Sequence, residues 1–144
     1  MPEVVLDANV LVGLLYGGDA QHDRARALVD RLEREGHSVV LLDVLVFEAV
    51  SVLCRRADER KTAPPDLGRA LAVVRGWFDQ GLVRPVGRDA ERLAGELLDT
   101  VVASGGALNV NDALLVALHR EAAIEALATF DADFDSVAGL ERIE

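Results

Sequence analysis

The fold class is decided near the start of the chain, by the sequence Val4-Val5-Leu6-Asp7-Ala8-Asn9-Val10-Leu11-Val12. Its first three residues form a short apolar run rich in β-branched side chains, which is typical of a strand buried on both faces. Asp7 ends that run, and an apolar stretch of helical character follows over residues 9–16, until Gly17 and Gly18 break it. A buried strand that leads through one acidic residue into an apolar helix predicts the first unit of an α/β domain.

The same alternation continues along the chain. Further strands are predicted at residues 38–42, 82–86 and 126–130, with a short last strand at 140–143. Helices are predicted over residues 19–35, 44–60, 66–80 and 89–104, and from Asn109 or Asn111 through Leu118, with aspartates 19, 43 and 66 as caps. Residues 61–65 form the clearest loop. We find no repeat and no linker, so residues 1–144 are expected to form a single three-layer domain with a mostly parallel sheet.

Four acidic residues stand at positions where this architecture places active sites. Asp7 and Asp131 directly follow predicted strands, and open parallel sheets bind their ligands at the carboxyl ends of the strands. Glu48 and Asp112 lie in otherwise apolar helical segments, where an isolated acid is costly unless something compensates it. Carboxylates that converge on one edge raise one another's pKa, and a hard divalent cation such as Mg²⁺ relieves that repulsion.

Each acid also has an ordinary structural explanation. Asp7 could be a helix N-cap, and Asp112 could favour the positive end of a helix dipole. Glu48 shares a helical face with Ser51 and Arg55, so its side chain could face solvent. The four acids together, at these places on one α/β scaffold, favour a common site.

These segments carry a resemblance to a known family. The chain resembles PIN-domain ribonucleases, and in particular the toxins of bacterial VapBC toxin–antitoxin pairs, in the order of four acidic motifs: Leu6-Asp7-Ala8-Asn9-Val10-Leu11-Val12, Phe47-Glu48-Ala49-Val50-Ser51-Val52-Leu53, Asn111-Asp112-Ala113-Leu114-Leu115 and Ala128-Thr129-Phe130-Asp131-Ala132-Asp133-Phe134-Asp135. Each motif alone is weakly specific, but the ordered set covers essentially the whole chain.

The resemblance implies a parallel sheet of strand order 3-2-1-4-5 between helices. It also assigns roles to site residues. Asp7, Glu48, Asp112 and Asp131 match the acidic quartet that binds Mg²⁺ or Mn²⁺, and Asp133 matches a position that is acidic in some members and would help through water. Asn9 and Thr129 match polar positions that support the first and fourth acids. Ala8 departs from the family, which often has Thr or Ser there.

The implied activity is hydrolysis of RNA. A carboxylate-held metal can activate water, polarise the phosphoryl oxygens and stabilise the leaving oxygen, so we expect in-line cleavage that leaves a 3′-hydroxyl and a 5′-phosphate. The resemblance further implies a small antitoxin partner, which would place a basic or apolar segment across the acidic groove, and a homodimer.

Two alternatives remain open. The segment from Val4 to Leu11 also resembles the first motif of haloacid-dehalogenase-like phosphatases, but Asn9 stands where their acid/base Asp would be and their later Lys has no clear match. The second alternative is a catalytically silent PIN scaffold that acts by binding; the intact acidic quartet argues against it.

Composition narrows the remaining classes. The chain has 25 acidic and 15 basic residues, and the formal net charge of −10 excludes a protein that coats nucleic acid through a cationic surface. RNA contacts are therefore expected from metal and from local arginines such as Arg55 or Arg56. The single cysteine excludes an intrachain disulfide. No apolar run reaches transmembrane length and the start does not resemble a signal peptide, so we expect a cytoplasmic protein with no membrane partner.

Overall fold

The computed structural model describes residues 2–59 and 65–144. They form a five-stranded sheet of order β3-β2-β1-β4-β5, in which every adjacent pair is parallel. The strands are β1 (Glu3–Leu6), β2 (Ser38–Leu42), β3 (Val83–Arg84), β4 (Ala126–Ala128) and β5 (Glu141–Ile143). The predicted fold class and strand order are confirmed.

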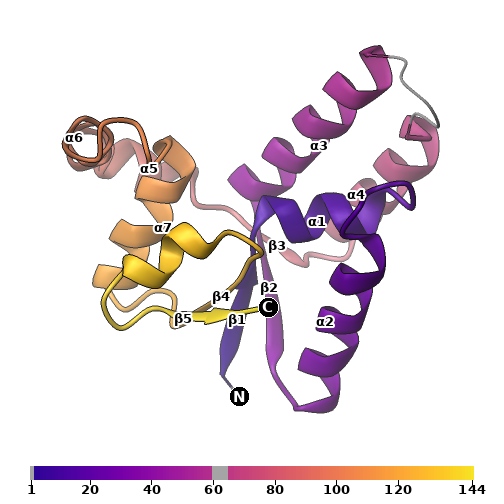
Figure 1. The fold of residues 1–144 in the computed structure, drawn as a ribbon, viewed down its shortest axis with the longest axis horizontal. Coiled ribbons are helices and arrows are strands. Elements are labelled where there is room, and N and C mark those ends of the chain that lie inside the picture. Colours follow the sequence, from indigo (N-terminus) through magenta and orange to yellow (C-terminus); the bar gives the residue numbers. More distant parts are fainter. Residues whose placement is uncertain (1, 60–64) are drawn as a thin grey trace.

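Helices lie on both sides of the central strand β1 (Figure 1). α1 (Ala8–Leu15), α2 (His22–Arg34), α3 (Asp43–Asp58) and α4 (Leu67–Asp79) gather on one side of the molecule, and α5 (Gly87–Arg92), α6 (Ala94–Ala103) and α7 (Val110–Arg120) on the other. A short 3₁₀ helix, η1 (Ala132–Ser136), follows β4. Among residues 2–59 and 65–144, no helix has both the length and the apolar character needed to cross a bilayer.

The central strands are buried because their side chains are apolar on both faces. Val4, Val5 and Leu6 are each at most 2% exposed, and β1 pairs with β2 on one side and β4 on the other. Val5 aligns with Val40 and Leu127, and Leu6 aligns with Ala128. This register brings the end of β1 beside the end of β4, so Asp7 and Thr129 start from neighbouring positions.

Two predicted boundaries are wrong at their first residues. Asp19 does not cap the second helix, which begins at His22; its carboxylate accepts a hydrogen bond from the backbone nitrogen of Gln21 and pairs with Arg56 instead. Asp43 is the first residue of α3 rather than its cap, and its carboxylate accepts from the backbone nitrogens of Val44 and Val86. Both aspartates accept hydrogen bonds from backbone nitrogens, Asp19 in a turn before α2 and Asp43 at the start of α3.

Other predicted elements are shortened or divided. The helix predicted over residues 89–104 is two helices that meet at Leu93, and the strand predicted at residues 82–86 pairs only over Val83–Arg84. Asn109, rather than Asn111, caps α7. The loop predicted at residues 61–65 and the end of the helix predicted at residue 60 lie outside the described residues, apart from Pro65.

Candidate active site at the carboxyl edge of the sheet

Asp7 is the most buried acid of the predicted quartet. It directly follows β1 and is 7% exposed. Its Oδ1 accepts a 2.8 Å hydrogen bond from the backbone nitrogen of Ala8, which caps α1, and its Oδ2 accepts a 2.7 Å bond from the Thr129 hydroxyl. Burial, with a smaller contribution from the charges of Asp112 and Glu48, raises the pKa of Asp7 to about 6 although these two hydrogen bonds lower it. Asp7 is therefore both the N-cap and the centre of an acidic site.

Thr129 joins the first acidic segment to the last. Its hydroxyl is completely buried, donates to Asp7, and accepts from Asn9 Nδ2 at 3.0 Å and from the backbone nitrogen of Asp131 at 3.1 Å. Asn9 Oδ1 in turn accepts from the backbone nitrogen of Phe130 at 3.3 Å. The hydroxyl thus uses its single donor and both acceptor positions. The structure places Asn9 and Thr129 where they fix the first acid and the start of the Asp131 turn.

Glu48 lies on α3 and is held from across the site. Its Oε2 accepts a 2.8 Å hydrogen bond from Asn111 Nδ2, a contact between residues 63 positions apart. The sequence offered Asn111 only as a possible start of a helix and gave it no role in the site. Its place immediately before Asp112 is the signal that could have identified it, since an amide there can orient a facing carboxylate.

Asp112 lies in the first turn of α7, where an acidic side chain favours the positive end of the helix dipole, as its ordinary structural explanation states. It forms a capping box with Asn109: Asp112 Oδ2 accepts from the backbone nitrogen of Asn109 at 3.1 Å, and Asn109 Oδ1 accepts from the backbone nitrogen of Asp112 at 2.9 Å. Burial raises the pKa of Asp112, and the charges of Glu48, Asp131 and Asp133 add to the rise. Within the described part of the chain no donor forms a hydrogen bond with Oδ1 of Asp112, so this oxygen can bind a ligand without losing a protein contact.

Asp131 and Asp133 belong to the turn after β4. Asp131 caps η1 by accepting from the backbone nitrogen of Asp133 at 2.9 Å; it is half-buried, whereas Asp133 is exposed. Asp135, the third acid of this run, pairs with Arg142 at 2.6 Å and is not among the charges that raise the pKa of Asp7 or Asp112. His119, which follows Asp112 by two helical turns, contacts the backbone oxygens of Ile124 and Ala138 instead of the acids.

The donor set fits a hard divalent cation. The acids come from four different segments, yet the charges of Glu48 and Asp112 raise the pKa of Asp7, and those of Glu48 and Asp131 raise the pKa of Asp112. All their donor atoms are oxygen. Over residues 2–59 and 65–144, no group of three or more Asp, Glu, His or Cys side chains is arranged so that it could hold a metal ion by itself. An open set of carboxylates suits Mg²⁺, which keeps several of its waters and uses few protein ligands.

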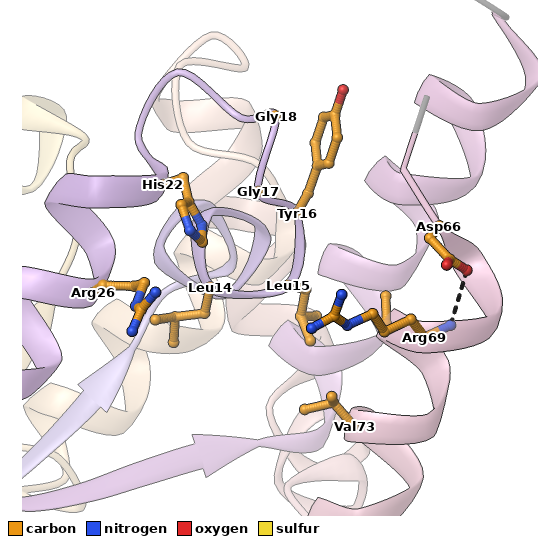
Figure 2. A pocket seen from close by; sticks show the side chains of 11 residues that line it. Leu14, Leu15, Tyr16, Gly17, Gly18, His22, Arg26, Asp66, Arg69 and Val73 are labelled. Atoms are coloured by element: carbon orange, nitrogen blue, oxygen red, sulfur yellow. Dashed lines mark hydrogen bonds between the residues drawn. The ribbon is translucent and has the colours of Figure 1, made fainter. Parts of the chain in front are cut away.

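One hollow borders this edge of the sheet and a second lies away from it. A cavity of about 250 Å³ lies directly beside the acids, and Asn9 and Glu48 form part of its wall. A larger groove of about 650 Å³ lies at the other end of α1, between α1, α2 and α4. In this groove Arg26 and Arg69 reach toward Leu14 and Leu15 from opposite sides (Figure 2).

Comparison with known proteins gives one family and several structural neighbours. The model of the PIN domain matches residues 4–140. The fold is similar to that of VapC20 from Mycobacterium tuberculosis, described as a toxin that cleaves the sarcin-ricin loop, with 25% identity, a TM-score of 0.65, and 96% of this chain and 97% of that chain covered. A comparison with curated proteins finds no match.

Two complexes also resemble the chain in fold. They are VapBC2 from Rickettsia felis, bound to a DNA fragment from its promoter (13% identity, TM-score 0.64, 99% of both chains), and DNA-bound VapBC from Salmonella typhimurium (17% identity, TM-score 0.62, 99% and 98%). At these identities the likeness concerns the fold.

Proposed function

This chain belongs to the PIN-domain family, and from that premise we propose that it is a divalent-metal-dependent endoribonuclease, the toxin of a type II toxin–antitoxin pair. The observation that carries the proposal is the buried Asp7, whose pKa is raised to about 6 by burial and by the neighbouring acids Glu48 and Asp112. A buried carboxylate held by two hydrogen bonds among other carboxylates is poorly explained by stability alone. The full-length likeness to an RNA-cleaving toxin supports the same reading.

The residues that would hold Mg²⁺ or Mn²⁺ are Asp7, Glu48, Asp112 and Asp131, with Asp133 acting through water. When bound, such a cation supplies an activated water and neutralises charge on the scissile phosphate. Thr129 keeps Asp7 in one orientation, and Asn111 does the same for Glu48. Water adds to phosphorus in line, the bond to the 3′ oxygen breaks and that oxygen takes a proton, so the products carry a 3′-hydroxyl and a 5′-phosphate.

The alternatives receive less support. In a phosphatase, the residue at position 9 would have to exchange protons, but both ends of the Asn9 amide are engaged by Thr129 and Phe130. A silent binding scaffold has no need for an acid as costly as Asp7. Hydrolysis of generic phosphomonoesters would favour the phosphatase. RNA binding without cleavage would favour the binding scaffold.

The decisive experiment maps RNA ends by sequencing after expression of the wild type and of Asp7→Asn. New 5′-phosphorylated ends that depend on Asp7 are expected, and with purified protein EDTA should abolish the cleavage and Mg²⁺ or Mn²⁺ restore it. The absence of reproducible new ends, or equal cleavage by Asp7→Asn, would remove the proposal. Because the proposed substrate is cellular RNA, we place the protein in the cytoplasm.

The antitoxin is proposed to use the groove between α1, α2 and α4. Two arginines there, Arg26 and Arg69, have no hydrogen-bonded or ion-paired side-chain partner among residues 2–59 and 65–144, whereas the chain as a whole is acidic. Leu14, Leu15 and Val73 supply an apolar floor. This chemistry fits a segment with apolar side chains flanked by carboxylates, which differs from the basic or apolar segment expected over the acids themselves.

A homodimer is proposed through a different surface. Leu98 and Val102 on α6 are 59% and 79% exposed, and Val110 at the start of α7 is 50% exposed. α6 lies far from the groove between α1, α2 and α4 (Figure 1), so a second copy and an antitoxin would not compete. Burying these side chains against a second copy would remove apolar surface from water.

A further inference from the structure

The cavity of about 250 Å³ beside the acids is formed by two kinds of side chain. Ala8, Val12 and Val52 supply apolar wall, while Gln21 and Arg56 supply hydrogen-bond donors. Glu48, a proposed metal-binding residue, belongs to the same lining, so any ligand in the cavity lies next to the reaction centre. The volume is below the range of about 300–1,000 Å³ that is usual for pockets holding whole drug-sized ligands, which favours one planar fragment of a larger substrate.

The charges around the cavity favour a neutral group over a phosphate. Two acids, Asp19 and Glu48, face one cation, Arg56. The ion pair between Asp19 and Arg56 neutralises only one of these acids, so a phosphate would meet residual negative charge. A nucleobase carries no charge and has two apolar faces, which suit the valine and alanine walls.

Arg56 is held in place before any ligand arrives. Asp19, whose side chain is 8% exposed, pairs with Arg56 through Oδ1 and accepts from the backbone nitrogen of Gln21 through Oδ2. The guanidinium also lies 5.8 Å from the centre of the Tyr16 ring. One aspartate therefore positions both the arginine and the start of the Gln21 segment, and this lowers the entropy lost when they bind a ligand.

The donors of the cavity determine which base would fit. The Asn9 amide is held by Thr129 and Phe130, so it has one fixed orientation and keeps one N–H of Nδ2 beyond the bond to Thr129. Gln21 Oε1 accepts a long hydrogen bond of 3.4 Å from Arg24, and in the described residues its Nε2 has no acceptor. Arg56 retains further N–H groups beyond the one that binds Asp19. A base edge with two adjacent acceptors, such as O6 and N7 of guanine, matches two such donors.

We infer that this cavity is a recognition pocket for an unstacked guanine of the RNA substrate, at the nucleotide next to the scissile phosphate. Gln21 and Arg56 read the acceptor edge, and Val12 and Val52 enclose the faces of the base. The inference rests on the proposed ribonuclease function and extends it to the substrate sequence. Single-stranded RNA is commonly recognised in this way, with one base turned out into a pocket.

The first test needs no cleavage. Metal-free protein is titrated with the four nucleoside 5′-monophosphates while NMR follows the methyl groups of Val12 and Val52 and the side-chain amide of Gln21. GMP is expected to shift these signals more strongly than AMP, CMP or UMP. Gln21→Leu, which keeps the size but removes the donor, should weaken GMP binding about tenfold. Gln80→Leu, at the end of α4 and outside the cavity, should leave GMP binding unchanged.

The second test compares cleavage profiles on an RNA of random sequence. The wild type should enrich guanine at one position beside the cut, and Gln21→Leu should lose that enrichment while Gln80→Leu keeps it. Val52→Phe, which fills the cavity from the opposite wall, should reproduce the loss if Gln21→Leu folds poorly.

The outcomes separate the two proposals. Specific GMP shifts without metal-dependent RNA cleavage would support the pocket and refute the ribonuclease. RNA cleavage with an unchanged base profile in Gln21→Leu and Val52→Phe, or equal shifts by all four nucleotides, would overturn the pocket and leave the ribonuclease standing.

Discussion

The hydroxyl of Thr129 donates a 2.7 Å hydrogen bond to Oδ2 of Asp7, although 122 positions separate the two residues in the chain. The parallel pairing of β1 with β4 makes this contact possible, because it aligns Leu6 with Ala128, the residues that precede them. The same hydroxyl accepts from Asn9 and from the backbone of Asp131. One buried side chain thus connects the first and fourth acidic segments of the site.

Replacement of this hydroxyl should weaken metal binding and shift the pH dependence. Thr129→Val keeps the shape but removes a hydrogen bond that lowers the pKa of Asp7, so this pKa should rise above its value of about 6. We expect the Kd for Mn²⁺, measured by calorimetry, to rise about 10- to 100-fold, as is typical when a residue supporting a metal ligand is lost. The loss of RNA cleavage should be larger at pH 6.5 than at pH 8.5.

Thr100→Val on α6 is the matched control for this change, since it makes the same substitution away from the acids. A Thr129→Val enzyme whose activity falls by the same factor at both pH values would contradict the role in setting the pKa of Asp7.

The stability of the metal-free protein should fall as the pH rises toward neutrality. The pKa of Asp7 is raised from 3.8 to about 6 in the folded chain, so between these values the folded state binds more protons than the unfolded state. The contribution of Asp7 to the free energy of unfolding is therefore most favourable below pH 4. It declines until about pH 6, by about 3 kcal/mol if Asp7 acts alone.

The difference between wild type and Asp7→Asn isolates this contribution from other titrating groups. In urea unfolding with EDTA from pH 4 to pH 7, the wild type should lose stability relative to Asp7→Asn as the pH rises. Asp7→Asn also loses one hydrogen bond at all pH values, because both partners of Asp7 are donors and the asparagine side chain has a single acceptor oxygen. Parallel pH profiles for the two proteins would show that the Asp7 carboxyl is not perturbed.

Asn111 should act through Glu48. Its amide donates a 2.8 Å hydrogen bond to Glu48 Oε2. Among the described residues this is the only hydrogen bond to the Glu48 carboxylate, and Asn111→Ala removes it. We expect cleavage to fall about tenfold and the combination with Glu48→Gln to be clearly less than additive, with a coupling energy of about 0.5–3 kcal/mol. Additive losses in the double-mutant cycle would assign Asn111 an independent role.

The fold was largely predictable because its strongest signals are local. The runs that become β1 and β2 are apolar throughout, and Gly36, Gly81, Gly105 and Gly106 all adopt positive φ close to helix ends, where glycine is favoured. The strand predicted at residues 82–86 is too long, because only Val83 and Arg84 pair with β2. The length of this pairing depends on tertiary geometry and not on local composition. The break at Leu93 has no proline or helix-capping side chain to mark it, and Gly95, two residues later, lies within α6.

The acids of the candidate site could be predicted from the sequence, but the residues that hold them in place could not. Order and spacing predicted that Asp7, Glu48, Asp112 and Asp131 share one site, and the charges that raise the pKa values of Asp7 and Asp112 come from this same set and from Asp133, in agreement with that prediction. The bond between Asn111 and Glu48 joins two helices, and the pair of Asp19 with Arg56 joins a turn to α3. A sequence alone does not show such contacts, because each partner is an ordinary polar residue in its own segment.

Charge reversal in the groove between α1, α2 and α4 should weaken the antitoxin complex. Arg26→Glu combined with Arg69→Glu replaces two cations that line the groove and have no side-chain partner in the described chain, so carboxylates of the partner would be repelled. Binding of a small protein co-expressed from the adjacent gene should weaken at least about tenfold, with a reduced dependence on salt.

Arg55→Glu with Arg88→Glu makes the same change of net charge outside this groove and should have little effect on that complex. An equal loss with both pairs would mean that only overall charge matters, and full binding by the groove variant would place the antitoxin elsewhere.

The proposed homodimer should depend on α6. Val102 is 79% exposed, so Val102→Glu costs the folded protomer little but would bury a charge in an interface formed by this face. In sedimentation velocity the wild type should be a dimer and Val102→Glu a monomer, while Leu82→Glu, at a position 52% exposed and following α4, should remain dimeric. Dimers of equal stability in all three proteins would exclude the α6 face. Because the proposed interface includes Val110, which precedes Asn111 and Asp112, the monomeric variant should also cleave RNA more slowly. A monomer of undiminished activity would separate dimerisation from the site.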